Sequence, residues 1–222
     1  MAELSALQID TGPEPQHTVI WLHGLGASGH DFEPVVPEFA FARDTPVRFI
    51  FPHAPELPVT INGGMVMPAW YDILAMDIDR KVDAAQLRAS AGHVAQLIEE
   101  EVTRGVPSES IIIGGFSQGG AVAYELALSY PKPLGGLFAL STYFATADTI
   151  SLSDANGNLP VFIAHGSYDP IVPEALGQAA TKRLQELGYK PEYQSYGMEH
   201  SLCLEEVGDL DAFLAQRVAA TK

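Results

Sequence analysis

The chain has 222 residues, of which 47% are hydrophobic, and a formal net charge of −16 at pH 7 from 28 acidic and 12 basic side chains. This length and apolar content predict an ordered chain with a substantial buried core. The negative charge repels nucleic-acid phosphates and anionic lipid headgroups, so neither is an expected partner. The single cysteine, Cys203, excludes a disulfide within the chain and fits a reducing compartment.

The first residues and the apolar stretches of the chain predict no targeting signal. Residues 1–10 have neither a basic region nor an apolar core, so we expect no signal peptide. No apolar stretch approaches about 18 residues, which is the length that a membrane-spanning helix needs. We therefore expect a cytoplasmic protein that does not insert stably into membranes.

Apolar runs typical of strands alternate with segments typical of helices. Strands are predicted at 4–10 (an edge strand), 17–23, 47–51, 111–113, 134–140, 159–164 and 192–196. Helices are predicted at 31–41, 83–104, from 121 onward, 173–187 and 202–218. Such alternation favours the α/β class, with a mostly parallel central sheet and helices on both faces. No repeat or linker divides the chain, so a single domain over residues 1–222 is expected.

Residues 54–72 interrupt this alternation. The segment is rich in proline and glycine, and Asn62-Gly63-Gly64 favours a hairpin turn. Long connections inside compact domains often cover a functional site. We therefore interpret it as an excursion from the sheet.

Ser117 lies in the strongest chemical motif of the sequence. The segment Gly115-Phe116-Ser117-Gln118-Gly119 matches G-x-S-x-G and stands between a predicted strand and a predicted helix. This context is typical of the nucleophile elbow of an α/β-hydrolase. The sharp turn exposes the serine hydroxyl and is tolerated only if the residues two positions away lack side chains. Ser117 is the predicted nucleophile.

The partners of Ser117 follow from chain order. In α/β-hydrolases the nucleophile is followed by an acid and then by a histidine. Asp169 lies just past a predicted strand, and His200 is the only one of the seven histidines beyond it. His200 would accept the serine proton, and Asp169 would orient the imidazole and stabilise its charged form. The alternatives are that Asp169 is a turn residue and that His200 is a solvent-facing loop residue.

The loop Gly24-Leu25-Gly26-Ala27-Ser28-Gly29 permits two interpretations. It matches G-x-G-x-x-G after a strand, which is a dinucleotide-binding pattern. That site also needs an acid at the end of the next strand, where the chain has proline and histidine instead. In a hydrolase the loop supplies an oxyanion donor, and the backbone N–H groups of Leu25 and Gln118 would share that role. His23 is then expected to hold the loop in place.

Other catalytic centres have little support in the sequence. There is no H-E-x-x-H motif, no histidine pair at helical spacing and only one cysteine. We therefore expect no metal site and no cofactor. A carboxylate pair for glycoside hydrolysis stays open, because no pair stands out among the acids.

Taken together, these residues show that the chain resembles the bacterial carboxylesterase and acyl-protein thioesterase family of small serine α/β-hydrolases. The matching motifs, in chain order, are Trp21-Leu22-His23-Gly24-Leu25-Gly26, Pro52-His53-Ala54-Pro55, Trp70-Tyr71-Asp72, Gly114-Gly115-Phe116-Ser117-Gln118-Gly119-Gly120, Ala139-Leu140-Ser141, His165-Gly166-Ser167-Tyr168-Asp169 and the segment around His200. The segment 59–72 is more similar to the bacterial carboxylesterases than to the eukaryotic thioesterases.

The resemblance implies a single α/β-hydrolase domain without a large cap, with Ser117, Asp169 and His200 as the triad. It also implies that the excursion 57–72 lines or covers an acyl pocket. The apolar side chains expected there, suited to a short or medium acyl chain, are Leu57, Ile61, Met65, Met67 and Trp70. The alternative is that they are ordinary core residues. Members of this family often form homodimers, so a homodimer is implied as well.

Glu199 departs from the family pattern, because many relatives have glycine directly before the catalytic histidine. A carboxylate beside His200 would favour the charged imidazolium. Glu199→Gly is then expected to move the acidic limb of the kcat/KM profile to lower pH. The alternative is a solvated carboxylate without effect on the histidine.

The sequence thus predicts a serine carboxylesterase that hydrolyses short- to medium-chain acyl esters through an acyl-enzyme intermediate. An acyl-protein thioesterase and a lysophospholipase are alternatives, because the same machinery serves all three. A non-catalytic binding module with the same fold is the remaining alternative.

Overall fold

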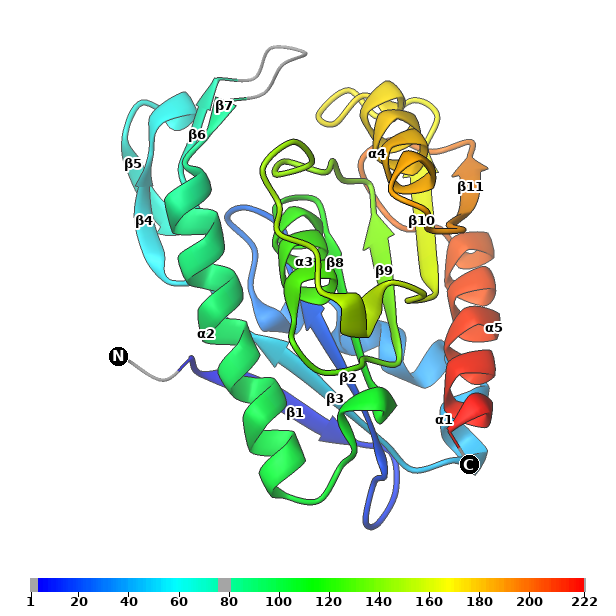
Figure 1. The fold of residues 1–222 in the computed structure, drawn as a ribbon. Helices are drawn as coiled ribbons and strands as arrows, with labels where there is room; N and C mark the ends of the chain where they lie inside the picture. The colour runs from blue at the N-terminus through cyan, green and yellow to red at the C-terminus, as the bar shows by residue number, and fades with distance from the viewer. Residues whose placement is uncertain (1–3, 76–80, 222) are drawn as a thin grey trace.

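A central sheet of seven strands has the order β1-β3-β2-β8-β9-β10-β11 (Figure 1). The computed structural model describes residues 4–75 and 81–221. The strands of this sheet are β1 (Ala6–Asp10), β2 (His17–Leu22), β3 (Val47–Pro52), β8 (Ile111–Phe116), β9 (Gly136–Leu140), β10 (Val161–Gly166) and β11 (Glu192–Tyr196). Strand β1 is antiparallel to β3, and the other neighbouring pairs are parallel. The predicted α/β class and the edge strand at the N-terminus are confirmed.

The central strands are apolar throughout because both faces of the sheet are covered. Strands β2 and β10 are buried along their whole length, and β8 is buried up to its last residue. Side chains alternate between the faces with a period of two. Ile111 and Ile113 therefore face one core layer, while Ile112 faces the other.

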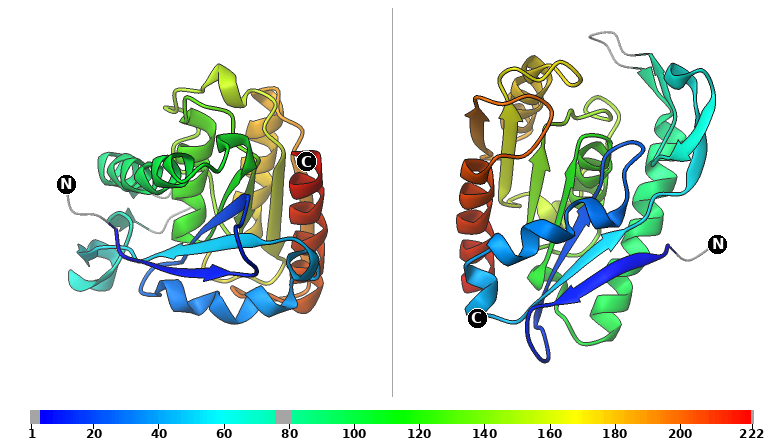
Figure 2. Two further views of the ribbon diagram at one scale, coloured as in Figure 1. Left: turned by 90° about the horizontal axis from the view of Figure 1, so that it is seen from below. Right: turned by 180° about the vertical axis from the view of Figure 1, so that it is seen from behind.

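Two helical layers enclose the sheet (Figure 2). The helices are α1 (Phe41–Asp44), α2 (Ala84–Thr103), α3 (Gln118–Ser129), α4 (Glu174–Glu186) and α5 (Leu204–Ala220). Helices α2, α3 and α4 contribute to one core layer, and α1 and α5 contribute to the other. The expected arrangement of helices on both faces is confirmed.

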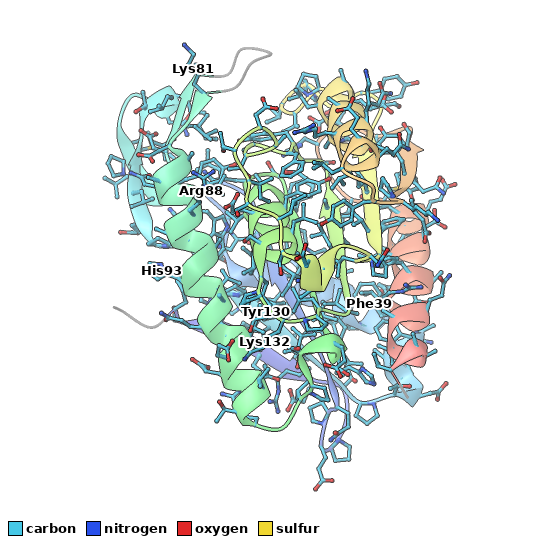
Figure 3. All side chains as sticks on the ribbon, viewed as in Figure 1. Phe39, Lys81, Arg88, His93, Tyr130 and Lys132 are labelled. Atoms are coloured by element: carbon cyan, nitrogen blue, oxygen red, sulfur yellow. The ribbon has the colours of Figure 1, made fainter. Side chains whose placement is uncertain are left out.

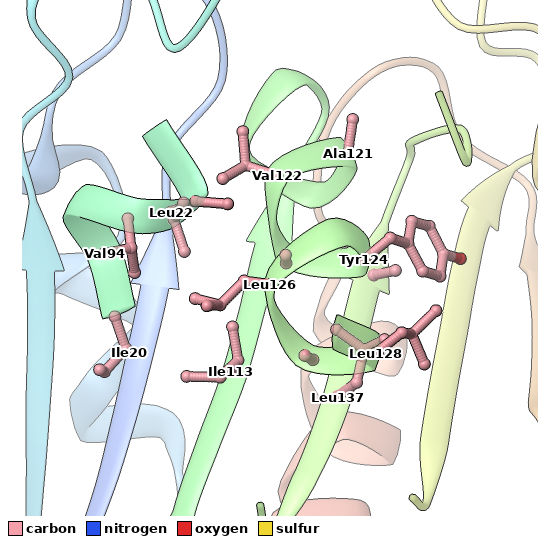
Figure 4. Close-up of a cluster of buried hydrophobic side chains, with 14 of the residues drawn as sticks. Ile20, Leu22, Val94, Ile113, Ala121, Val122, Tyr124, Leu126, Leu128 and Leu137 are labelled. Atoms are coloured by element: carbon pink, nitrogen blue, oxygen red, sulfur yellow. The ribbon is translucent and has the colours of Figure 1, made fainter. Parts of the chain in front are cut away.

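The layer between α2, α3 and the sheet is the larger core cluster (Figure 4). Val94 of α2 is fully buried there, as are Ile20 and Ile113 of the sheet, and Leu126 of α3 is 3% exposed. Truncating such residues to alanine costs about 2–5 kcal/mol in well-packed cores. This layer holds α3, and with it the turn that precedes α3, rigidly against the sheet.

Helix α2 agrees closely with the helix predicted at 83–104. Asp83 precedes the helix, and its carboxylate accepts a hydrogen bond from the Gln86 N–H. Gly105 follows the helix with a φ of 102°. This left-handed conformation suits glycine and ends the helix.

On its outer side α2 is tied to neighbouring segments by charged groups (Figure 3). The Arg88 guanidinium pairs with Glu125 of α3, with 3.1 Å between Nε and Oε1. Lys132 lies 2.7 Å from a carboxylate oxygen of Glu99. These contacts are partly exposed to solvent, so each contributes little to stability compared with the core.

The continuous helix predicted at 31–41 is confirmed only as short helical turns. This segment forms the 3-10 helices η1 (Gly29–Asp31) and η2 (Glu33–Glu38), followed by the short helix α1. Pro37 lies inside η2. Proline lacks an N–H donor and its ring clashes with the preceding turn of an α-helix, which accounts for the tighter and shorter elements.

The excursion contains the predicted hairpin. Strands β4 (Glu56–Val59) and β5 (Met65–Pro68) pair antiparallel and are joined by η3 (Thr60–Asn62). Gly63 and Gly64 complete the turn with φ values of 67° and 78°. A second small pair is formed by β6 (Ile73–Ala75) and β7 (Lys81–Val82). Both pairs lie beside the start of α2, away from the edge of the sheet that carries β11 (Figure 1).

Candidate active site

Ser117 occupies a sharp turn between β8 and α3, with φ 54° and ψ −122°. Non-glycine residues rarely adopt this conformation, which is strained. The glycines on either side permit close backbone contacts: a Cβ on Gly115 would lie 2.4 Å from the carbonyl carbon of Gly119. A Cβ on Gly119 would lie 2.5 Å from the carbonyl oxygens of Leu22 and His23. Glycine is therefore required two positions before and after Ser117.

The structure brings Ser117, His200 and Asp169 together in one hydrogen-bonded chain. The distance between Ser117 Oγ and His200 Nε2 is 2.9 Å, and that between His200 Nδ1 and Asp169 Oδ2 is 2.6 Å. With Asp169 ionised, Nδ1 donates to the carboxylate and Nε2 accepts from the serine hydroxyl. Ser117 follows β8, Asp169 follows β10 and His200 follows β11. Because the carboxyl ends of parallel strands lie at one edge of the sheet, the three residues meet there.

Asp169 is buried and is held by further donors. Its Oδ1 accepts hydrogen bonds from the backbone N–H groups of Ile171 and Val172, both at 2.8 Å. Burial opposes ionisation of Asp169, but the hydrogen bonds from His200, Val172 and Ile171 outweigh it and lower the pKa of this carboxyl. Asp169 is therefore a carboxylate aimed at His200. Asp169 thus also stabilises the turn around Pro170 through Oδ1, as in the alternative interpretation, while Oδ2 faces His200.

His165 is a residue near the site to which the sequence assigned no role. Its side chain is fully buried, and Nε2 donates to the Val172 carbonyl oxygen at 2.8 Å. Burial lowers the pKa of His165, which keeps the imidazole neutral. The motif that contains Asp169 begins with His165, but no local pattern indicates that the two side chains interact.

A cavity of about 470 Å³ adjoins Ser117 and His200. It is mostly apolar and is lined by Gly24, Leu25, Ala27, Asp31, Phe32, Val35, Phe116, Ser117, Ile171, His200, Ser201 and Leu202. The Phe116 ring packs against the His200 imidazole with 4.7 Å between ring centroids. The cavity can therefore receive an apolar group attached to a carbonyl at Ser117.

None of the five side chains predicted for the acyl pocket lines this cavity. Leu57 and Met67 are paired across the hairpin, Ile61 is half-buried in η3, and the Met65 side chain is 64% exposed. Their contact with an acyl chain stays a prediction. Trp70 is 1% exposed and its indole N–H is occupied by the His23 carbonyl oxygen. Trp70 is thus a core residue, as in the alternative interpretation.

The backbone N–H groups of Leu25 and Gln118 have no hydrogen-bond acceptor among the residues that the structure describes. Leu25 itself lines the cavity, and Gln118 directly follows Ser117. The loop that carries Leu25 is fixed by the next residue, because the Gly26 N–H donates to the Pro68 carbonyl oxygen at 2.8 Å. Two free N–H donors beside the nucleophile are what an oxyanion needs.

His23 holds this loop, as the sequence predicted. Its Nδ1 lies 2.7 Å from the Gly24 carbonyl oxygen, and its Nε2 accepts a hydrogen bond from the Ala54 N–H at 3.0 Å. The imidazole is therefore the tautomer with a proton on Nδ1. Burial lowers the pKa of His23 and keeps it neutral.

Comparison with known proteins identifies the family. The family model described as phospholipase/carboxylesterase matches residues 7–218. The chain belongs to the phospholipase/carboxylesterase family. As a member it is a serine hydrolase of carboxylic esters or thioesters.

Relatives of this phospholipase/carboxylesterase family member include named thioesterases. Acyl-protein thioesterase 1 of Neurospora crassa is 40% identical over 212 residues, which cover 90% of this chain and 86% of the relative. The protein of the same name from Gibberella zeae is 38% identical, with coverages of 91% and 92%. These relatives are fungal, so the narrower expectation of a bacterial carboxylesterase type is not supported.

Solved structures of similar fold include two plant proteins. SOBER1 of Arabidopsis thaliana has a TM-score of 0.84 and 31% identity, covering 91% of this chain and 99% of the other. Acyl-protein thioesterase 2 of Zea mays has a TM-score of 0.83 and 28% identity, with coverages of 96% and 99%. The carboxylesterase of Bacillus cereus, at 20% identity and a TM-score of 0.78, shows the same fold.

The other interpretations of the sequence fit this family member less well. The loop at 24–29 leads into 3-10 helices, so it lacks the α-helix N-terminus on which a dinucleotide pyrophosphate rests. Within residues 4–75 and 81–221, no group of three or more His, Cys, Asp or Glu side chains has the geometry of a metal site. No helix among these residues is long and apolar enough to cross a membrane.

Glu199 forms no ion pair with His200 among the described residues. Its side chain is exposed, and in the described part of the chain His200 forms an ion pair with Asp169 and with no other carboxylate. Water screens an exposed carboxylate strongly. This arrangement favours the solvated alternative, in which Glu199→Gly leaves the acidic limb of the kcat/KM profile unchanged.

Proposed function

We propose that this protein hydrolyses acyl thioesters on proteins through an acyl-enzyme intermediate on Ser117. The observation that carries the chemistry is the hydrogen-bonded chain from Ser117 Oγ through His200 to Asp169. This arrangement performs acyl transfer on several unrelated folds. The names of the relatives from Neurospora crassa and Gibberella zeae support the substrate class, because both are acyl-protein thioesterases.

In the proposed mechanism, Ser117 Oγ attacks the thioester carbonyl carbon while its proton passes to His200 Nε2. The N–H groups of Leu25 and Gln118 stabilise the negative charge on the carbonyl oxygen. The tetrahedral intermediate expels the thiolate, which takes the proton from His200. A water molecule then attacks the acyl-enzyme, gives its proton to His200 and releases the carboxylic acid, and Ser117 recovers its proton.

Asp169 keeps the imidazole in the required tautomer and stabilises the imidazolium during both steps. Its lowered pKa ensures that it is ionised at neutral pH. The cavity beside Ser117 is mostly apolar, and among the described residues that line it Asp31 is the only carboxylate. Such a lining suits an acyl chain and does not attract anionic substrates.

Hydrolysis of short- to medium-chain oxygen esters is a second candidate function. It is favoured by the family description, which includes carboxylesterases. A lysophospholipid substrate is weaker, because the net charge of −16 disfavours anionic lipid surfaces.

The deciding experiment measures kcat/KM on matched oxygen esters and thioesters with the same acyl groups, from acetyl to palmitoyl, together with an S-palmitoylated peptide. Turnover of the peptide and of long thioesters, abolished by Ser117→Ala, supports the proposal. A preference for short oxygen esters, with an intact peptide, replaces it with the carboxylesterase. Turnover that survives Ser117→Ala removes Ser117 as the nucleophile.

Three structural expectations belong to this proposal. We propose that residues 1–222 form one catalytic domain, since a single sheet runs from β1 to β11. Contact of the acyl chain with Leu57, Ile61, Met65 and Met67 predicts that alanine substitutions there change chain-length preference. The homodimer implied by the resemblance stays a prediction, which light scattering on the purified protein would test.

A further inference from the structure

The two N–H groups assigned to the oxyanion belong to distant parts of the chain. Leu25 lies in the loop after β2, and Gln118 is the first residue of α3. An oxyanion hole works only if both donors are held at fixed positions before the reaction. A third segment, which contains Trp70 and Tyr71 and follows the β4–β5 hairpin, contacts the supports of both donors.

The indole of Trp70 fixes the entrance to the Leu25 loop. Its Nε1–H donates to the carbonyl oxygen of His23 at 2.8 Å. The rings of Trp70 and His23 also pack together, with 5.2 Å between centroids. His23 in turn holds the Gly24 carbonyl oxygen. The peptide two residues before Leu25 is therefore held by a buried side chain.

The backbone of the same segment fixes Gln118. The Trp70 N–H donates to Gln118 Oε1 at 2.8 Å, and Gln118 Nε2 donates to the Tyr71 carbonyl oxygen at 2.6 Å. The side-chain amide thus pairs with the main chain on both of its ends. Gln118 is 1% exposed, so water does not compete for these bonds.

Trp70 is itself anchored from a third side. Its carbonyl oxygen accepts a hydrogen bond from the hydroxyl of Ser90, which is buried in α2. Ala69 and Tyr71, its neighbours, are fully buried. The segment therefore has the rigidity that a support requires, and Trp70, which is 1% exposed, has almost no surface with which to contact an acyl chain.

We propose that Trp70 is a positioning residue of the oxyanion hole, which fixes the Leu25 loop and Gln118 relative to each other. This inference rests on the proposed function, because it takes Leu25 and Gln118 as the oxyanion donors. It gives Trp70 a role distinct from the acyl contact that the resemblance implied. The hydrogen bond from its indole to His23 predicts an effect on the transition state and little effect on substrate binding.

The test compares two tryptophan variants. Trp70→Phe keeps an aromatic ring and removes the N–H donor. Trp21→Phe is the matched control, because Trp21 is also fully buried and its Nε1 has no hydrogen-bond partner among the described residues. Loss of a whole oxyanion donor lowers kcat by about 10²- to 10³-fold, so a displaced donor is expected to lower it by roughly 10- to 100-fold. KM of Trp70→Phe and kcat of Trp21→Phe should stay within about threefold of wild type.

A boronic acid inhibitor supplies a readout that a purely structural role would not change. Ser117 Oγ adds to the boron atom, its proton passes to His200, and the resulting tetrahedral anion places an oxygen at the oxyanion site. Trp70→Phe should weaken boronate binding by the same factor by which it lowers kcat/KM. Binding of the product carboxylic acid, which forms no tetrahedral adduct, should change little.

Gln118→Met provides an independent variant if Trp70→Phe does not fold. It removes the amide that pairs with residues 70–71 and keeps the backbone donor. The same fall in kcat and in boronate affinity is expected. Unchanged boronate affinity in a folded variant, or equal losses in Trp70→Phe and Trp21→Phe, would overturn the inference. Because Ser117→Ala tests the proposed function separately, failure of one is distinguishable from failure of the other.

Discussion

His165 Nε2 lies 3.7 Å from Asp169 Oδ2, and both side chains are buried. His165 donates to the Val172 carbonyl oxygen, and the N–H of Val172 donates to Asp169. On the other side of the ring, a Cβ on Gly177 would lie 2.4 Å from Nδ1. The imidazole is thus packed between α4 and the loop that carries Asp169. Because the pKa of His165 is lowered, His165 stays neutral, and His200 is the histidine that becomes charged beside Asp169 during the reaction.

We expect His165→Phe to lower kcat/KM by about 10-fold and stability by about 1–3 kcal/mol, because the Val172 carbonyl loses its buried donor. His165→Gln, which offers an amide donor, should recover part of both losses. Steady-state kinetics and urea unfolding measure the two effects. His93→Phe, on the half-exposed side of α2, is the control. Normal kinetics in a folded His165→Phe variant would show that the Asp169 loop does not need this support.

Asp169→Asn is expected to lower kcat by about 10³- to 10⁴-fold with little change in fold, since an amide cannot stabilise the imidazolium. The same variant tests the lowered pKa of Asp169. A depressed pKa gives the native state stability above the ordinary carboxyl range, and this stability is lost as pH falls through the native pKa. Wild type should therefore lose more stability than Asp169→Asn between neutral and strongly acid pH. Parallel stability curves would contradict the assigned hydrogen bonds.

Glu206 lies in the first turn of α5 with a fully buried side chain, and neither carboxyl oxygen has a hydrogen-bond partner within the described residues. Burial raises its pKa to about 8, and the nearby polar backbone of Cys203, which lies outside hydrogen-bond geometry, offsets this only in part. Above the ordinary pKa of a glutamate, the unfolded chain has released the Glu206 proton, whereas the native state still keeps it. The free energy of unfolding should therefore fall as pH rises from the ordinary glutamate pKa to the raised pKa of Glu206, and level off above pH 8.

Glu206→Met removes this titration and keeps a side chain of similar length. Between pH 5 and pH 8, wild type should lose on the order of 1–3 kcal/mol of stability relative to the variant. Urea unfolding at a series of pH values measures the difference. Glu205→Met, at the neighbouring exposed position, should show no such trend. A constant difference across the pH range would mean that Glu206 is ionised throughout.

Gly119→Ala is expected to lower both activity and stability. Its new Cβ would lie 2.5 Å from two backbone oxygens at the end of β2, and backbone cannot move aside cheaply. A loss of about 1–3 kcal/mol and a fall in kcat should appear together, because α3 begins beside Ser117. Gly92→Ala in α2 is the control, since nothing lies within 4 Å of its added Cβ. This control should gain up to about 1 kcal/mol from helix propensity. Equal behaviour of the two variants would refute the close-approach argument.

The central sheet and the order of the three site residues were predictable from the sequence. Buried parallel strands are apolar on both faces, so β2, β8 and β10 appear as uninterrupted apolar runs. The α/β-hydrolase order of serine, acid and histidine then left a single histidine after Asp169. Local patterns were sufficient because each of these residues follows the end of its own strand.

The segment 31–41 shows where local patterns fail. Its apolar spacing suits a helix, but Pro37 cannot continue α-helical hydrogen bonding, and the chain forms η2 instead. The roles of Trp70 and His165 could not be assigned from the sequence for another reason, which Trp70 illustrates. An aromatic side chain has the same letter in a core and in a pocket, and the partners of Trp70 lie on two distant segments.

The strand that delivers His200 is also the last strand of the sheet. Strand β11 pairs with β10 alone in the described sheet, so one row of hydrogen bonds holds it in place. Local opening at such an edge needs less free energy than unfolding of the whole domain. Detachment of β11 would separate His200 from Ser117 while β2, β8 and β9 stay folded. Inactivation at low denaturant should therefore precede the loss of secondary structure. The loss of turnover then measures the opening of the β11 edge of the sheet, and the loss of secondary structure measures the unfolding of the whole domain.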